Sequence, residues 1–307
     1  MDGLLLLEQT LNGLQFGVFL FLISAGLTLV FGIMNMVNLA HGSLYMIGAY
    51  LAATVYQATG SFILAIVVTI PASLLVGVVL EIVALRTLYD RDHLAQVLAT
   101  FGLILFFNEV VRMIWGPGGQ FLSPPDWLAG HVEIIPGAPY PTFRLAIIAA
   151  GLVVALLLYV LITRTRIGML IRAGASNRPM VGALGVNIKL LYTMVFGLGA
   201  ALAGFAGLMA GPVLSVEPGM GEPMLILAFV VIVIGGIGSV RGAFVASIMV
   251  GIVNTLGRTM IPYLLGGIVS TEAAQTAGPA IASMLIYILM AGVLFFRPQG
   301  LFPARTG

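Results

Sequence analysis

The stretch from Gln9 to Leu80 contains no Lys, Arg, Asp or Glu, and it constrains the fold more than any other feature. In a typical water-soluble domain roughly a quarter of the residues are charged, so a segment of this composition could not face water. Hydrophobic residues make up 60% of the whole chain and charged residues only 8%. We therefore expect an all-α polytopic membrane protein that forms one transmembrane domain over residues 1–307.

Apolar runs separated by polar residues, Pro or Gly predict the individual transmembrane helices. Crossing a bilayer takes roughly 20 apolar residues in a helix, and most of the runs approach or reach this length. The runs are Leu11–Met34, Ser43–Gln57, Phe62–Leu85, Leu94–Trp115, Leu145–Thr163, Leu190–Gly211, Met224–Ile234, Ala243–Ile261 and Pro279–Phe296. The run Met224–Ile234 is too short to cross alone. The sequence thus predicts about eight or nine transmembrane helices, some of them broken or re-entrant.

Basic residues predict the orientation, because Lys and Arg are enriched in loops on the cytoplasmic side. The segment 164–189 carries five basic residues and no acidic one, and Arg241 marks another inside loop. The segments 116–143 and 212–223 carry acidic residues and lie between other spans, so we expect them outside. Further inside positions are Arg86, Arg91, Arg297 and Arg305. Alternation then places the N-terminus outside.

The segment 32–43 interrupts two apolar runs with polar side chains. Transporters often place such broken helices along the translocation path, where Asn, His and Ser side chains satisfy freed backbone groups or bind substrate. The alternative is a tight, hydrogen-bonded turn between two helices near the membrane edge. The candidate path residues here are Asn35, Asn38, His41, Gly42 and Ser43.

The segment 235–242 is a second interruption, rich in glycine. It resembles a phosphate-binding loop only superficially, because no Lys-Ser/Thr pair follows the glycines. We expect the glycines to break a helix and to let backbones pack closely. Its layout is similar to that of 32–43, which suggests an internal repeat. We therefore add Gly235, Gly236 and Gly238 to the candidate translocation path.

The inside loop 164–189 predicts two short helices joined by a turn. One amphipathic helix can run over about 168–174, and a second can begin at Asn177 as its cap, with Pro179 in the first turn and Gly185 as a stop. Such a protrusion could bind a soluble partner. The alternative is a plain basic loop held at the lipid headgroups.

The remaining polar features give no catalytic or metal-binding set. Glu109 and Arg112 can pair on one helix face, and Glu81 near Arg86 suggests a residue at the membrane boundary. The aromatic residues of the loop 116–143 indicate either interfacial anchors or a docking surface for an external partner. Without cysteine, the chain has no disulfide, thiol or cysteine–metal chemistry, and a net charge of +2 gives no reason to expect nucleic acid as a partner.

Several segments together resemble the permeases of branched-chain amino acid ABC importers. They are Gly-Leu-Thr-Leu-Val-Phe-Gly-Ile-Met-Asn-Met-Val-Asn-Leu-Ala-His-Gly at 26–42, Arg-Thr-Arg-Ile-Gly-Met-Leu-Ile-Arg-Ala at 164–173, Asn177 with Gly-Ala-Leu-Gly-Val-Asn at 182–187, the segment 231–242, and Arg-Pro-Gln-Gly-Leu-Phe at 297–302. The resemblance covers nearly the whole chain. The length and the short polar N-terminus are similar to the H-type permease of these importers rather than to the larger M-type.

The resemblance implies a machine of several chains in the bacterial cytoplasmic (inner) membrane. A second homologous permease would share the path, two cytoplasmic ATPases would dock on the inside loops, and an extracytoplasmic solute-binding protein would deliver substrate. The chain itself would need no cofactor, since ATP would bind to the ATPases. The resemblance also makes 164–189 the coupling loop, in which the positions expected to act are Arg164, Arg166, Arg172, Gly174, Asn177, Gly182 and Gly185.

Other functions stay open at this point. The same machine could carry urea, short amides or aromatic carboxylates instead of hydrophobic amino acids. A stand-alone secondary transporter is a more distant alternative, which the basic inside loop and the lack of convergent intramembrane acids disfavour. A membrane enzyme is disfavoured because no catalytic set of residues is recognisable.

Overall fold

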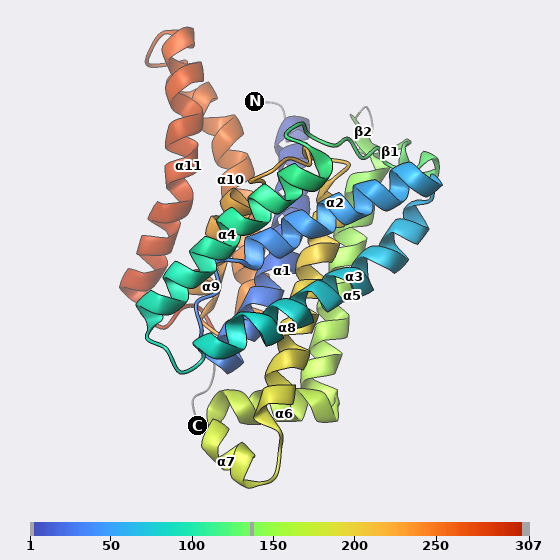
Figure 1. The fold of residues 1–307 in the computed structure, drawn as a ribbon. Coiled ribbons are helices and arrows are strands. Elements are labelled where there is room, and N and C mark those ends of the chain that lie inside the picture. The colour runs from blue at the N-terminus through green and yellow to red at the C-terminus, as the bar shows by residue number, and fades with distance from the viewer. Residues whose placement is uncertain (1–2, 136–137, 303–307) are drawn as a thin grey trace.

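The computed structural model describes residues 3–135 and 138–302, which form a helical bundle with a small β-hairpin at one end (Figure 1). Seven helices are long and apolar enough to cross a membrane. These are α1 (Gly3–Met34), α3 (Phe62–Val83), α4 (His93–Trp115), α5 (Thr142–Arg164), α8 (Ile188–Ala210), α10 (Val240–Leu265) and α11 (Thr271–Phe296). The all-α polytopic prediction is confirmed.

Two further helices are the broken elements that the sequence predicts. The apolar helix α9 (Gly221–Gly235) is shorter than the seven. The helix α2 (His41–Thr59) follows the non-helical segment 35–40 and lies oblique to α1 in Figure 1. The predicted run Ser43–Gln57 is therefore a real helix, but α2 is not among the seven that are long and apolar enough to span by themselves.

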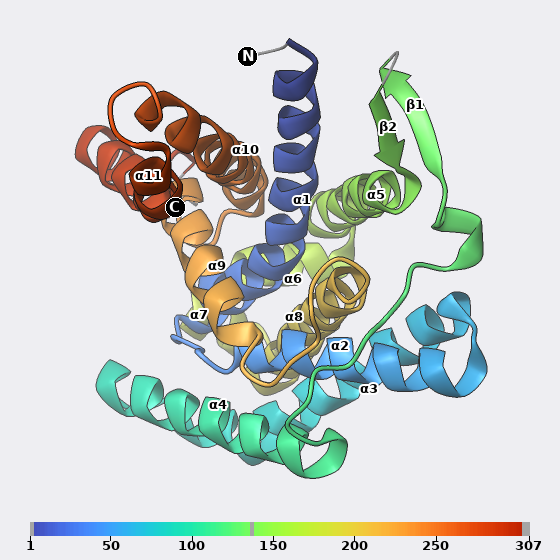
Figure 2. The same cartoon turned by 90° about the horizontal axis from the view of Figure 1, so that it is seen from above.

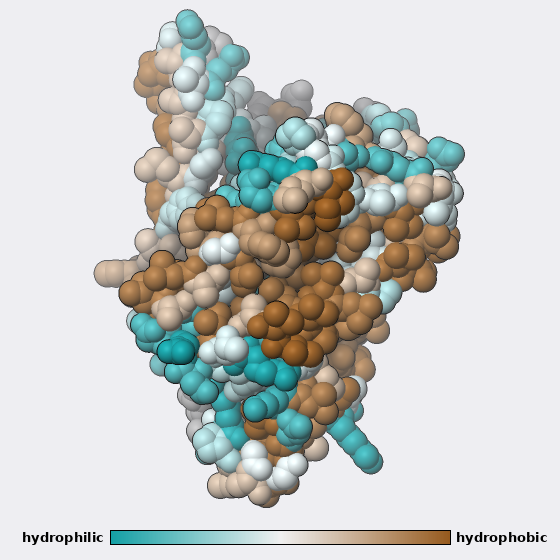
Figure 3. Space-filling model, in the orientation of Figure 1, coloured by the Kyte–Doolittle hydropathy of each residue, from teal (hydrophilic) through white to brown (hydrophobic). Residues whose placement is uncertain are grey.

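Helices α1 and α8 form the centre of the bundle, and the other spans surround them. In their most apolar stretches α1 and α8 are 83% and 78% buried, whereas α11 is only 11% buried. Helix α1 packs against α10, α8, α5 and α9, and α8 packs against α3 and α2. Figure 2 shows α4 lying outermost, beyond α2 and α3, with α10 and α11 on another side of α1. A belt of exposed apolar side chains crosses the middle of the molecule in Figure 3, as expected for a surface in contact with lipid.

Glycines bring the backbones of the central helices into direct contact. Gly48 of α2 meets Gly204 of α8, and Gly26 of α1 meets Gly199 of α8. Small residues allow such close approach, which is the main source of helix association inside a membrane, where apolar side chains gain little by leaving lipid. These glycines thus set how closely α1 and α2 approach α8.

Glu81, predicted as a boundary residue near Arg86, lies near the end of α3 and is the buried centre of a polar network. Its carboxylate accepts hydrogen bonds from Arg86 at 3.2 and 3.0 Å, from Thr193 at 2.7 Å and from Tyr89, and it is fully buried. Burial and the neighbouring carboxylate raise the pKa of Tyr89, so its hydroxyl stays the donor. The network joins α3, the short helix η1 (Leu85–Leu88) and α8 at the end of the bundle that carries the basic loops.

The loop 116–143 contains more regular structure than the sequence predicts. A turn, η2 (Asp126–Leu128), precedes the antiparallel strands β1 (His131–Ile135) and β2 (Ala138–Pro141). An isolated bridge between Gln120 and Val216 joins this loop to the segment 212–223. The two segments that we expect outside therefore contact each other.

The basic and acidic loops lie at opposite ends of the bundle, as the orientation rule requires. Figure 1 places α6 (Arg166–Ser176) and α7 (Arg178–Ala183) at one end, and β1 and β2 at the other with the start of α1. The predicted inside residue Arg305 lies outside the described residues. That the α6–α7 end faces the cytoplasm stays a prediction from the charge asymmetry.

Candidate translocation site

The helix α1 ends in a turn that sends the chain back toward the middle of the bundle. Asn35 adopts the left-handed conformation (φ 52°), which Asn tolerates better than most residues. Asn38 then accepts a hydrogen bond from the backbone N–H of Ala40 at 3.1 Å, and the Nε2 atom of His41 lies 3.1 Å from the carbonyl oxygen of Ile23. Ile23 precedes Met34 by a helical rise of about 16 Å. The helix α2 therefore begins opposite the middle of α1.

The helix α9 also begins inside the membrane. Its 15 residues extend about 22 Å, less than the roughly 30 Å of a hydrocarbon core. Its last residue, Gly235, packs against Gly242 at the start of α10. Its first residue, Gly221, packs against Gly42 in the first turn of α2. The N-termini of two helices thus meet within the membrane.

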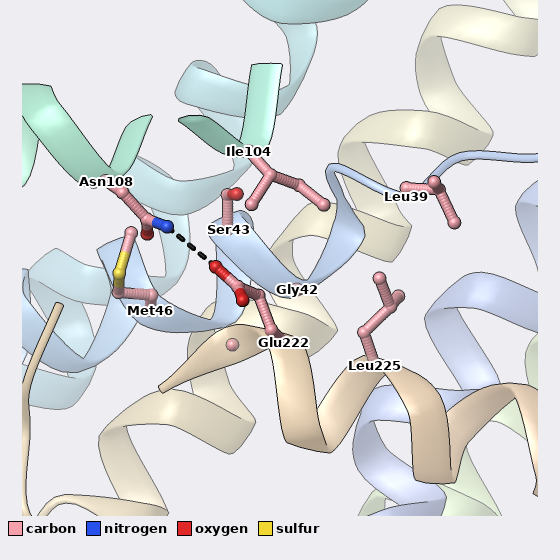
Figure 4. A pocket seen from close by; sticks show the side chains of 9 residues that line it. Leu39, Gly42, Ser43, Met46, Ile104, Asn108, Glu222 and Leu225 are labelled. Atoms are coloured by element: carbon pink, nitrogen blue, oxygen red, sulfur yellow. Dashed lines mark hydrogen bonds between the residues drawn. The ribbon is translucent and has the colours of Figure 1, made fainter. Parts of the chain in front are cut away.

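A pocket lies where these two N-termini meet, on the side facing α4 (Figure 4). It is a shallow, closely packed recess without room for a water molecule, lined by Leu39, Gly42, Ser43, Met46, Ile104, Asn108, Gly221, Glu222 and Leu225. The side-chain amide of Asn108 donates a hydrogen bond of 2.7 Å to the carboxylate of Glu222. The hydroxyl of Ser43 makes no hydrogen bond with the other residues drawn in Figure 4, although Ser43 is only 3% exposed. An apolar wall and a few polar groups are typical of small-molecule sites.

The candidate residues of the segment 32–43 fall into three groups. Gly42 and Ser43 line the pocket. Asn38 and His41 are fully buried beside it and hold the returning segment in place through the hydrogen bonds given above, so they do not line the pocket surface. Asn35 is exposed directly after the last residue of α1, which favours the turn interpretation for this residue.

The candidate glycines at 235–238 lie far from the pocket, at the opposite end of α9. The chain continues here from α9 to α10, with φ of 102° at Gly236 and 80° at Gly238, so the predicted helix break is present. The C-terminal turn covers this point, since Leu301 N–H donates to Ile234 and Phe302 N–H donates to Gly235. Gly238 packs against Gly32, so the two interruptions touch near the C-terminal end of α1. The structure does not bring these glycines together with Ser43.

Glu222 and Asn108 are the pocket residues that the sequence interpretation missed. In the sequence, Glu222 belongs to the segment 212–223, which is predicted to lie outside. Asn108 is a single polar residue within the apolar run 94–115. The partial signal was the short run Met224–Ile234, because a helix too short to span must begin below the membrane surface. Their proximity is a tertiary contact between α4 and α9 and leaves no trace in local sequence.

The loop 164–189 has the predicted helix-turn-helix form. The helix α6 is capped by Thr165, which accepts from Gly168 N–H at 3.0 Å, and α7 is capped by Asn177, which accepts from Met180 N–H at 3.0 Å. Gly185 follows α7 with φ of 87° and ends it as predicted. The predicted coupling residues Arg164, Arg166, Arg172, Asn177, Gly182 and Gly185 are exposed.

Gly174 differs from the other predicted coupling residues, because it lies on the buried face of α6. A Cβ atom at this position would lie 3.1 Å from Leu191 and 3.9 Å from Ile33. Gly174 therefore seats α6 on the bundle rather than contacting a partner. The protrusion instead exposes apolar side chains that the sequence interpretation did not single out, namely Ile167, Met169, Met180 and Leu184.

Comparisons with known proteins agree on one family. Residues 9–294 match the family described as the permease component of branched-chain amino acid transport systems. The chain is 30% identical to the high-affinity branched-chain amino acid transport permease BraD of Pseudomonas aeruginosa, over 96% of this chain and 95% of BraD. It is 29% identical to LivH of Escherichia coli K12, over 95% and 96% of the two chains. The probable permease LivH of Methanocaldococcus jannaschii is 25% identical, over 92% and 88%.

No solved structure matches the chain. The family match spans every transmembrane helix, the re-entrant segment 35–40 and the α6–α7 protrusion, so it applies to the whole fold described above. This chain is a multi-pass membrane protein and belongs to the family of permease components of branched-chain amino acid ABC transport systems.

Proposed function

We propose that this chain forms half of an inward path for branched-chain and other hydrophobic amino acids, paired with a second, homologous permease. The observation that carries the proposal is the pocket at which α2 and α9 begin within the membrane. Broken helices that meet near the bilayer midplane form the substrate site in many transporters. The wall of Leu39, Ile104 and Leu225 suits a hydrocarbon side chain better than urea or a short amide.

In this proposal, the energy for uptake comes from ATP hydrolysis by two ATPases that bind to the α6–α7 protrusion. Its exposed Met and Leu side chains would be costly to leave in water, and the basic residues around them can pair with acidic groups of a soluble subunit. An extracytoplasmic binding protein would deliver the amino acid at the opposite end, where the loop 116–143 meets the segment 212–223.

Reconstitution of the assembled complex into vesicles tests this function. We expect the chain to copurify with a second permease and two ATPases, and the vesicles to take up leucine, isoleucine and valine only with ATP and the loaded binding protein. Urea, acetamide and benzoate serve as competing cargoes. Uptake by this chain without ATPases, or preference for one of those cargoes, would contradict the proposal.

A further inference from the structure

Glu81 is a fully buried carboxylate near the end of a transmembrane helix. It is the first charged residue of the chain after Glu8. An ionisable residue in a transmembrane segment is costly and usually functional. A buried charge is tolerated only when good hydrogen bonds compensate for the lost water, and here Arg86, Tyr89 and Thr193 supply them. The position of this network in the bundle suggests what it does.

The start of α8 supports the α6–α7 protrusion (Figure 1). A Cβ atom at Gly174 of α6 would lie 3.1 Å from the side chain of Leu191, so α6 rests directly on Leu191. The guanidinium of Arg178, the first residue of α7, lies beside the hydroxyl of Tyr192. Both helices of the protrusion therefore contact neighbouring residues at the start of α8.

The same part of α8 also contacts the Glu81 network. The ring of Tyr192 packs edge-on against the ring of Tyr89, with 5.1 Å between the ring centroids. The next residue, Thr193, donates a hydrogen bond of 2.7 Å to the Glu81 carboxylate. The residues from Leu191 to Thr193 thus connect the protrusion on α8 with the end of α3.

The contact between Thr193 and Glu81 can open without leaving a buried polar group unpaired. A threonine hydroxyl carries one hydrogen, and the carbonyl oxygen of Lys189 in the same helix lies 3.0 Å from it as a second acceptor. Glu81 would keep its bonds from Arg86 and Tyr89. Arg86 also donates to the Thr193 oxygen at 2.9 Å, but its side chain is 32% exposed, so water can replace that acceptor. The contact therefore has two satisfied arrangements.

We propose that the hydrogen bond between Thr193 and Glu81 is a releasable joint that couples the α6–α7 protrusion to α3 during transport. While the bond holds, the end of α3 moves with the start of α8. When it breaks, Thr193 turns to the Lys189 carbonyl and α8 moves alone. Coupling through a protein requires such an element with two discrete arrangements. Thr193 and Glu81 are positioning residues, because they act on the cargo only through the helices.

The inference rests on the proposed function, because it requires ATPases that bind and move the protrusion. A purely structural role for the same hydrogen bond has a different consequence: its loss would lower assembly, ATP hydrolysis and uptake together. The substitution Thr193→Val nearly keeps the shape of the side chain and removes the hydroxyl. Thr193→Ser restores the hydroxyl, so it separates the hydrogen bond from the packing of the side chain.

The experiment measures the cargo imported per ATP hydrolysed by the complete reconstituted transporter. The matched control is Thr163→Val at the same end of the bundle, where the hydroxyl donates to the Tyr159 carbonyl of its own helix at 2.6 Å. We expect Thr193→Val to lower the ratio by about tenfold, the effect of one hydrogen bond to a charged group, while ATP hydrolysis and the yield of the complex stay close to the wild type. Thr193→Ser should restore most of the ratio, and Thr163→Val should match the wild type.

The outcomes separate this inference from the proposed function. The cargo is leucine, or whichever of urea, acetamide and benzoate the wild-type complex imports instead. If Thr193→Val keeps the wild-type ratio, or if Thr193→Ser does not restore it, the joint is wrong and the permease function stands. If Thr193→Val lowers uptake, ATP hydrolysis and yield in equal proportion, Thr193 only supports the fold and the inference is overturned. A wild-type complex that contains no ATPases contradicts the proposed function, and this inference with it.

Discussion

Replacing Met180 and Leu184 together by Asp is expected to abolish ATP-driven uptake and to remove the ATPase subunits from the purified complex. The two side chains are 57% and 76% exposed on the α6–α7 protrusion. Burying a large apolar side chain contributes about 1.5–3 kcal/mol, so the loss of two weakens docking by roughly 100-fold or more. Neither substitution changes the buried contacts of Val181 and Gly174 that hold the protrusion on the bundle.

The control for this variant introduces the same two acids at the other end of the molecule. Val213 and Leu214 are 37% and 39% exposed in the outer segment 212–223, and Val213→Asp with Leu214→Asp should leave the ATPases bound. Copurification from membranes measures both variants. If the complex with Met180→Asp and Leu184→Asp keeps its ATPases and its uptake, the ATPases bind at another surface.

Replacing Gly48 by Leu is expected to prevent stable folding. Gly48 of α2 faces the backbone of Gly204 in α8, and a Cβ atom there would lie 2.5 Å from the Gly204 carbonyl oxygen. Real Cβ atoms do not approach backbone so closely, and the two helices would have to separate. Overpacking in a close-packed interior usually costs about 1–3 kcal/mol, and a larger cost is expected where both neighbours are backbone. The monodisperse fraction in detergent, measured by gel filtration, should fall to near zero.

The matched control is Gly102→Leu in α4. No atom lies within 4 Å of a Cβ built at Gly102, so the new side chain points into open space. Because Leu also has a higher helix propensity than Gly, this variant should purify at least as well as the wild type. Equal yields of the two variants would contradict the packing of α2 against α8.

Features of the fold that depend on neighbouring residues could be predicted from the sequence. Apolar runs mark the helices, because the solvent around them is lipid and every backbone group must be satisfied within the helix. The start and end of α7, marked by Asn177, Pro179 and Gly185, were predictable for a similar reason. Caps and stops act over only three or four residues. The predicted orientation rests on the charge of the basic loop alone and stays a prediction.

Features that depend on contacts between distant segments could not be predicted. Glu81 reads as a boundary residue, and only the packing of α3 on α8 shows that Thr193 closes a network around it. Glu222 and Asn108 meet because α4 crosses the N-terminus of α9, and no periodicity in the sequence encodes that crossing. The hairpin of β1 and β2 lies in a Pro-rich loop, in which strand pairing depends on register rather than composition.

The candidate path residues of the segment 32–43 show the same difference between local signals and contacts of distant segments. The sequence located the interruption at 32–43 correctly, and its polar residues all looked equivalent. The structure separates them by depth, because the segment 35–40 climbs from the end of α1 to its middle. Ser43 therefore reaches the pocket, whereas Asn35 stays at the C-terminal end of α1.

Labelling of single cysteines tests the orientation on which the account depends. The chain contains no cysteine, so each substitution introduces the sole thiol. Spheroplasts that express Met180→Cys or Trp127→Cys are treated with a membrane-impermeant maleimide before and after permeabilisation. Trp127 is 65% exposed in the loop 116–143, and its Cys variant should react at once, whereas Met180→Cys should react only after permeabilisation. The reverse pattern would place the α6–α7 protrusion outside the cell and contradict the proposed coupling to cytoplasmic ATPases.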